Sequence, residues 1–444
     1  MSKNFKIIYE SGADSSATEQ KMFLKLETEK GEFVTPQETD FFYHMGGGIN
    51  HEQPFEPSKQ KSGRHNLSTI KKKETTSWSL TTYLNQNNTQ GVDTPIMTLL
   101  KSLLGNEISG PPLRYNSLIR PNISFTLLEV SDLWSKQAPG SFVMGAGLKF
   151  PGDGESTIEW SGNSKTTQFA GIGKIASISG NDVTLEGEDL EGFTSGALVM
   201  IIKADGTTRS TDTVGGSART IDKADFDNGV ATLSGGTLGD VAAGDYLTYY
   251  EPERAIASTE SIIGLTGNLK VGAKIIPIRN FEVNIQNNHE LHDYYYGTAG
   301  LGPKLFSASK RLLVEPTTQV NVDKESFAVI AGSKRLKDQG LTITLGDEGS
   351  SRLVVALPKV RLKVPNFTVP DEGSIPVDYQ GTALATSEDL ADEVTITVLK
   401  PGEELGPPPV PSPEPVTEAA NFTESNTKRR TSRKKGEEDG VSKS

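Results

Sequence analysis

The chain contains no cysteine in its 444 residues. This absence excludes disulfides, thiolate metal sites and cysteine nucleophiles, and it leaves the redox compartment undetermined. Long apolar runs are also missing, because none approaches the roughly 20 residues that span a bilayer. Residues 1–5 lack the apolar segment of a secretory signal. We therefore expect a soluble chain that has no membrane span and is not exported.

Catalytic motifs are absent as well. The sequence has no serine-hydrolase elbow, phosphate loop or dinucleotide fingerprint. The glycine run at residues 46–48 precedes no convincing helix and lacks the Lys-Ser/Thr pair of a phosphate loop. Asp153, Glu155 and Glu159 would suit the two carboxylates of a glycosidase, but their spacing equally fits a solvated hairpin tip. The sequence thus predicts no catalytic residues, no cofactor and no enzyme.

The nearest approach to a metal motif is formed by His289, Glu290, His292 and Asp293. A zinc-protease helix places its two histidines at i and i+4. Here the spacing is i and i+3, in a segment that ends a strand and precedes three tyrosines. The pattern favours a polar turn flanked by packing tyrosines, so no metal site is predicted.

The net charge of −12 is concentrated in one segment. Residues 171–253 hold 5 basic and 14 acidic residues, a net charge of −9, whereas residues 401–444 carry −1 and the remainder −2. General DNA affinity needs an excess of Lys and Arg on one face, which this balance does not supply. The basic runs at residues 71–73 and 428–435 are interpreted as solvated segments, with weak, sequence-independent contact left open.

Short strands with two unlike faces dominate residues 262–399. Such strands pack on one side and present the other side to solvent or to a partner. Apolar and polar residues alternate with period two in four segments: residues 281–287, 341–345, 359–364 and 394–398.

One helix is predicted, at residues 94–104. Asp93 or Thr94 can cap it, Pro95 suits its first turn, and Gly105 ends it. Five apolar residues at i, i+3, i+4, i+7 and i+8 predict that it lies flat on a sheet. These are Ile96, Leu99, Leu100, Leu103 and Leu104.

Changes in strand length, charge and proline content along the chain divide it into four predicted regions. The main β domain is predicted from residues 1–169, which include a long loop at residues 35–75, and from residues 255–400. Between them, residues 170–254 contain very short strands separated by turn-forming pairs, which indicates an inserted acidic β-barrel of five or six strands. Residues 401–444 are Pro-rich and basic, and we expect a disordered tail there.

Several segments resemble the tail tube proteins of tailed bacteriophages, and their order along the chain carries the resemblance. One is the helix Thr94-Pro-Ile-Met-Thr-Leu-Leu-Lys-Ser-Leu-Leu-Gly105, which follows a strand ending in Tyr83-Leu84. The others are residues 147–155 leading to Trp160-Ser-Gly162, and residues 278–288 followed by 341–346 and 375–378. Together they cover most of residues 35–165 and 260–400.

The resemblance implies a mainly β fold, a tail-tube-type β-sandwich or barrel with one flanking α-helix. Six copies would form a ring, and stacked rings would form the tube of a virion, made in the host cytoplasm. The partners would be further copies, the tape measure, terminator and baseplate proteins, and a sheath if the tail contracts. DNA would pass through the lumen without sequence-specific binding.

The resemblance also indicates where the two segments that the family pattern lacks, the inserted domain and the C-terminal tail, should lie. The inserted domain and the tail should face outward, because some eighty residues inside the channel would block DNA. Lys359, Arg361 and Lys363 fit a lumen wall badly, so we expect them at a contact between subunits or on the outer surface.

Two other functions remain open. A carbohydrate-binding or host-surface adhesion protein of a virion is suggested by the inserted barrel and by Trp134, Trp160 and the tyrosines. The third hypothesis is that the protein is a glycan-degrading enzyme.

Overall fold

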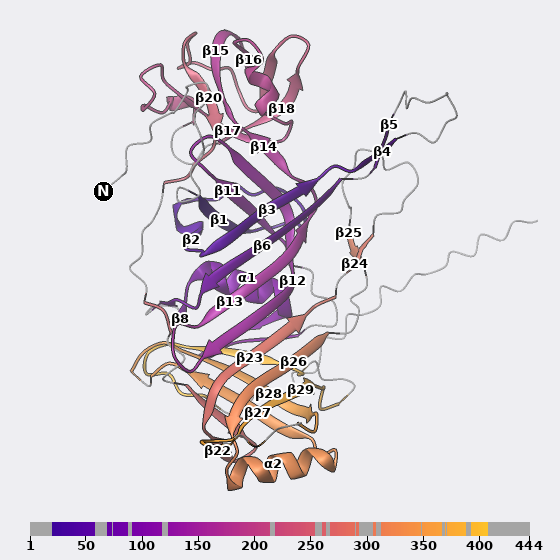
Figure 1. The fold of residues 1–444 in the computed structure, drawn as a ribbon. Helices are drawn as coiled ribbons and strands as arrows, with labels where there is room; N and C mark the ends of the chain where they lie inside the picture. Colours follow the sequence, from indigo (N-terminus) through magenta and orange to yellow (C-terminus); the bar gives the residue numbers. More distant parts are fainter. Residues whose placement is uncertain are drawn as a thin grey trace, which may run out of the picture. The chain divides into compact units, whose positions relative to one another are not determined.

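The computed structural model shows a mainly β chain with two α-helices among the residues that it describes (Figure 1). The chain divides into two units, residues 1–405 and 406–444, and all described residues except Gly406 belong to the first. The predicted tail beyond residue 406 lies outside the described residues, as do residues 1–19. The described ranges are residues 20–57, 69–72, 74–87, 91–117, 123–213, 218–253, 260–262, 267–288, 290–292, 305–307, 312–347, 349–365, 369, 371–387 and 392–406.

Seven antiparallel strands form what we call the central sheet. In Figure 1 its strands run side by side across the molecule, from β3 to β29. Buried and exposed residues alternate along most of them, which is the two-faced pattern predicted from the sequence. In spatial order the strands are β3 (Gly46–Glu52), β6 (Thr75–Tyr83), β13 (Thr157–Ser164), β12 (Ser135–Pro151), β23 (Ile278–Gln286), β26 (Leu313–Asn321) and β29 (Pro376–Ala383).

Two further groups of strands extend the central sheet. One continues from β29 through β28 and shares a single apolar core with the central sheet. The other is joined through the first half of β12, which pairs with β11 and β14. The first group is β28 (Arg352–Leu362), β27 (Gln339–Leu345), β21 (Asn268–Val271), β22 (Lys274–Ile276), β30 (Thr395–Leu399), β10 (Leu113–Ser117) and β9 (Gly105–Ile108); the second is β2 (Phe41–Phe42), β1 (Lys21–Leu26), β11 (Phe125–Val130) and β14 (Gln168–Ala170).

The predicted helix is present as α1 (Thr94–Leu104). Gly105 ends it in the left-handed conformation at φ 88°, which is the role expected of a glycine there. The five residues of the apolar stripe are all buried, and α1 packs against β12. The prediction of a helix lying on a sheet is therefore confirmed.

A second helix, α2 (Lys324–Lys334), was not predicted, so the expectation of one flanking helix is wrong. Its apolar residues form no wide stripe, and Val329 and Ile330 are its large buried side chains. The start of α2 is instead marked by a capping box. Asp323 Oδ1 accepts from Ser326 N, and Ser326 Oγ accepts from Asp323 N, both at 2.7 Å.

The acidic segment folds into a closed barrel of six strands, which confirms the predicted small barrel. The six strands agree with the five or six that were predicted. One of them, β18, has a single buried residue, Ile221, and therefore gives almost no alternating signal. The barrel shares an apolar core with Phe23 of β1 and with Leu128 and Val130 of β11. Gln137 of β12 adds a polar link, since its amide donates to Leu198 O at 2.9 Å and accepts from Leu198 N at 2.7 Å. The strands, in barrel order, are β15 (Ile172–Ser179), β16 (Asp182–Leu185), β19 (Val230–Leu233), β18 (Arg219–Asp225), β17 (Leu198–Ile202) and β20 (Tyr246–Tyr249).

The long loop expected at residues 35–75 is wrong for Gly46–Glu52, because β3 pairs with β6 along its whole length. The glycine run belongs to the sheet: a Cβ at Gly47, where φ is 101°, would lie 2.0 Å from Ser79 O. Residues 58–68 of the loop lie outside the described residues. The remaining elements are η2 (Glu38–Asp40), β4 (Phe55–Pro57), β5 (Thr69–Lys71), β7 (Gln86–Asn87), β8 (Gly91–Val92), η3 (Asp189–Gly192), η4 (Thr211–Thr213), β24 (Glu290–His292) and β25 (Leu305–Ser307).

Neither α1 nor α2, the two α-helices within the described ranges, has the length and apolar character that a membrane crossing requires.

Candidate functional site: the open face of the central sheet

The central sheet has one face in the core and one open, polar face. On β23, Phe281, Val283 and Ile285 are buried, while Glu282, Asn284 and Gln286 are exposed. On β6, Trp78 and Leu80 are buried, whereas Ser77 and Ser79 are exposed and Thr81 is half-buried on the open face. The alternation predicted for residues 281–287 therefore located this face correctly on β23.

Strand register aligns the outward residues into three rows that cross the sheet. Each row passes through β6, β13, β12, β23 and β26, so residues from 79 to 313 in sequence, 234 positions apart, share one row. The rows are Ser79–Ser161–Gly145–Gln286–Leu313, Thr81–Glu159–Gly147–Asn284–Glu315 and Tyr83–Thr157–Lys149–Glu282–Thr317.

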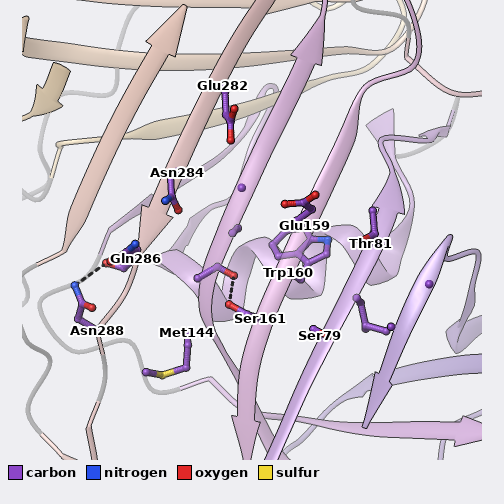
Figure 2. A pocket seen from close by; sticks show the side chains of 16 residues that line it. Ser79, Thr81, Met144, Glu159, Trp160, Ser161, Glu282, Asn284, Gln286 and Asn288 are labelled. Carbon is purple, nitrogen blue, oxygen red and sulfur yellow. Dashed lines mark hydrogen bonds between the residues drawn. The ribbon is translucent and has the colours of Figure 1, made fainter. Parts of the chain in front are cut away.

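A hollow of about 730 Å³ lies on this open face (Figure 2). Its lining includes Gly46, Gly145 and Gly147, and it is bordered by polar side chains such as Glu159 and Asn284. A Cβ at Gly46 would have no atom within 4 Å, and one at Gly147 would meet Glu159 at an ordinary 3.8 Å. Backbone geometry and packing do not demand glycine at these two positions. Glycine inside a strand often marks a place where a ligand or another backbone comes close.

The charge of the three rows is slightly negative. They contain Glu159, Glu282 and Glu315 against one basic residue, Lys149. Lys149 Nζ contacts Glu159 Oε1 at 2.6 Å, so its charge is locally compensated. Such a face offers hydrogen-bonding groups to a passing polymer but gives phosphates no basic stripe to bind.

The outer edge of β3 is covered by side chains. Glu129 accepts from Ile49 N at 2.7 Å, Lys136 Nζ donates to Ile49 O at 3.0 Å, and Gln20 Nε2 donates to Gly47 O at 3.0 Å. A further strand cannot pair with β3 at these residues without displacing those groups. This protects an edge that would otherwise add strands from other chains.

The three carboxylates considered for glycosidase chemistry have separate surroundings. Glu159 pairs with Lys149, and Glu155 lies beside Tyr83, where its charge and hydrogen bond raise the pKa of that phenol. Asp153 is exposed in the turn after β12.

The histidine segment is described only in part. Glu290 and His292 lie in β24, which pairs with β25, whereas His289 and Asp293 fall outside the described ranges. Within those ranges, no three metal-ligating side chains come together.

The basic residues of the expected strand at 359–364 lie at the surface. Arg361 Nη2 contacts Asp338 Oδ1 at 2.9 Å, Lys359 Nζ is 3.9 Å from Asp338 Oδ2, and Lys363 is exposed. The strand is shorter than expected: β28 ends at Leu362, and Val364 is exposed instead of facing the core.

Sequence reasoning missed two exposed apolar features. Phe55 and Ile70, on the hairpin of β4 and β5, are 68% and 58% exposed. Phe327 and Leu336, on and just after α2, are also exposed. Single apolar residues in polar segments give no periodic signal, so only their placement in the structure reveals them.

The chain matches no protein-family model, and no curated protein is similar to it.

Proposed function

We propose that this chain is the structural subunit of a phage tail tube, built from stacked hexameric rings that conduct DNA into a host. The observation that carries the proposal is the open face: a broad, antiparallel, polar sheet surface with a glycine-floored hollow and a slight negative charge. A conduit wall needs a surface that stays hydrated and does not hold the phosphate backbone.

The hairpin of β4 and β5 supports assembly. A two-stranded hairpin is marginally stable alone, yet this one exposes Phe55 and Ile70 to solvent. Exposed apolar side chains rimmed by polar residues are typical of protein contacts. Phe55 is opposite Lys71 and Ile70 is opposite Glu56, so the two apolar side chains lie on opposite faces of the hairpin. Neighbouring subunits would have to contact both faces to bury them.

The covered edge of β3 limits how subunits meet in a ring. Because Gln20, Glu129 and Lys136 occupy the outer edge at Gly47–Ile49, neighbours would meet there through side chains. A continuous backbone ladder between subunits would have to use other strands.

The adhesion alternative is weakened by one of the residues that suggested it. Trp160 is buried, and its Nε1 donates to Thr82 Oγ1 at 3.0 Å, so its ring is not available as a sugar platform. No other observation on the open face favours that function.

Electron microscopy of the purified chain over a range of concentrations tests the proposal. Rings of six subunits and tubes of stacked rings are the expected particles, with light scattering giving the mass of a ring. Monomers that persist at high concentration, with native circular dichroism, would overturn the proposal.

A further inference from the structure

The surface around the end of α2 combines apolar exposure with an unfavourable backbone. Leu336 is 66% exposed and adopts φ 54°, at the position after the helix where glycine is the usual residue. Phe327 is 55% exposed on the helix. Leu336 is not buried in the core, and a leucine is unfavourable at a positive φ, so neither packing nor the turn explains it. An outlier of this kind is a reason to look for function.

Basic side chains surround these two residues. Lys334, Arg335 and Lys337 are exposed, and none of them has an ion pair among the described residues. Lys334 lies seven residues after Phe327, on the same side of α2. Hydrogen bonds from Arg335 N and Lys337 N to Gly332 O hold the chain end against the helix. We call Phe327, Lys334, Arg335, Leu336 and Lys337 the α2 surface.

The barrel carries a surface of the opposite charge. Four of its five basic residues are paired with acidic residues of the barrel itself. Glu188 and Asp227 remain exposed without an ion pair among the described residues, and Phe226 beside Asp227 is exposed too. A hydrogen bond of 2.9 Å from Leu185 N to Gly229 O brings their two segments together. We call Glu188, Phe226 and Asp227 the barrel surface.

Strand β12 separates the two surfaces. Its first residues pair with β14 and, through Gln137, hold Leu198 of the barrel. Its last residue, Pro151, pairs with Asn280, which in turn pairs with Gln319 shortly before α2. The 17 residues of β12 correspond to about 50 Å of extended chain. The barrel and α2 are therefore connected to opposite ends of one strand.

We propose that the barrel surface of one copy docks on the α2 surface of a second copy, head to tail. The proposal rests on the proposed function, because it names a contact that joins one ring to the next. Two different, complementary patches make a heterologous contact, which extends an assembly without closing it. Opposite charges steer the encounter, and the aromatic and leucine side chains form the desolvated centre. The chain itself supplies the acidic partner that the α2 surface lacks.

Paired charge reversals test this contact. K334E/R335E is expected to leave folding and rings intact but to shorten tubes at least tenfold, and E188K/D227K is expected to do the same. The quadruple variant, in which both charges are exchanged, should regain tubes. K270E/K400E is the matched control, since it changes net charge equally at exposed lysines outside both the α2 surface and the barrel surface, and it should form tubes as the unmodified chain does.

A third variant tests the apolar centre independently of charge. Leu336→Gly removes the strained leucine, so melting temperature should stay equal or rise while tubes become shorter. Tubes of unchanged length from both K334E/R335E and Leu336→Gly would overturn the docking proposal while leaving the tube function standing. If the unmodified chain forms no rings, the proposed function itself fails.

Binding of a labelled 20-base-pair DNA duplex tests whether the α2 surface binds nucleic acid instead of a second copy of the chain. The unmodified chain should not retain the duplex at physiological salt. Retention that is lost in K334E/R335E would assign the α2 surface to nucleic acid and overturn the proposal.

Discussion

The barrel and the central sheet are both antiparallel, but one is closed and the other has an open face. Every barrel strand has a partner on each side, and its acidic residues are largely held by its own lysines, arginines and backbone amides. The central sheet buries one face and leaves the other, with its hollow, to solvent. The barrel has no open strand edge, and its apolar core continues onto Phe23, Leu128 and Val130 of β1 and β11. The central sheet, by contrast, has a surface whose features folding does not explain.

The same contrast holds for individual carboxylates. Hydrogen bonds from Thr208 and Thr207 lower the pKa of Asp205 to about 2, and Thr211 and Lys203 do the same for Asp240. In the main domain, burial raises the pKa of Asp93 to about 6. Acids on the barrel are thus stabilised as charges, and the acid next to α1 is not.

The largest effect should come from the buried face of the sheet. Phe281→Ala removes a fully buried ring that stacks on Phe150 at 6.3 Å, so we expect a loss of about 3–5 kcal/mol in the free energy of unfolding. Gln286→Ala, five residues along the same strand on the open face, is the control and should change it by less than about 0.5 kcal/mol. Urea denaturation followed by circular dichroism measures both. Equal losses would show that the two faces do not differ as described.

The link between barrel and sheet should give the next largest effect. Gln137→Ala leaves Leu198 N without its buried acceptor and removes one of the two donors to Leu198 O, the other being Tyr250 N, which costs about 1–3 kcal/mol. Limited proteolysis should then cut near residues 170 and 250 while each core stays protected. Gln319→Ala, at a half-buried glutamine on β26 that donates to Asp378 Oδ1 at 3.0 Å, is the control. Cleavage spread through the sheet would contradict a local role for Gln137.

The parts of the fold that sequence predicted are those with local signals. The helix at Thr94–Leu104 has a stripe, a proline start and a glycine end, and β23 has strict alternation. By contrast, α2 buries little apolar surface and is set by the Asp323–Ser326 capping box and by a hydrogen bond from Tyr379 Oη to Ser326 O. That bond joins residues 53 positions apart, so no local pattern contains it.

The candidate site was predictable in outline only. Alternation on β6 and β23 indicated a polar face, but the meaning of the glycines depends on register between distant strands. Gly147 lies opposite Glu159 on one side and Asn284 on the other, and Gly46 lies opposite Thr81. Read along the chain, the glycine run at residues 46–48 resembled part of a loop, which is how β3 was missed.

A smaller effect, of opposite sign in two assays, is expected for Gly147→Val. The site accepts a Cβ, and valine favours strands, so stability should rise by about 0.5–1 kcal/mol. The added side chain fills the floor of the hollow, so DNA delivery by reconstituted particles should fall. Gly180→Ala is unsuitable as a control because its φ is 67°; Ser77→Val, on β6 outside the hollow lining, is the better match. Unchanged delivery with Gly147→Val would remove the functional reading of the hollow.

The smallest effect should appear at Asp93 and depends on pH. Because its folded-state pKa is about 6 against an ordinary 3.8, the native state holds the proton more tightly, and Asp93 lowers stability as pH rises through 6. Asp93→Asn should therefore raise stability at pH 7 by up to about 1 kcal/mol, with partial exposure limiting the gain. The gain should shrink below pH 6 and vanish near pH 4.

Asp205→Asn on the barrel is the opposite case. The lowered pKa means that the Asp205 carboxylate stabilises the fold above pH 3.8, so this variant should lose stability at pH 7 and match the unmodified chain near pH 2. Thermal melts of both variants from pH 2 to 8 should show curves of opposite sign, and curves of the same sign would contradict the contrast between the two regions.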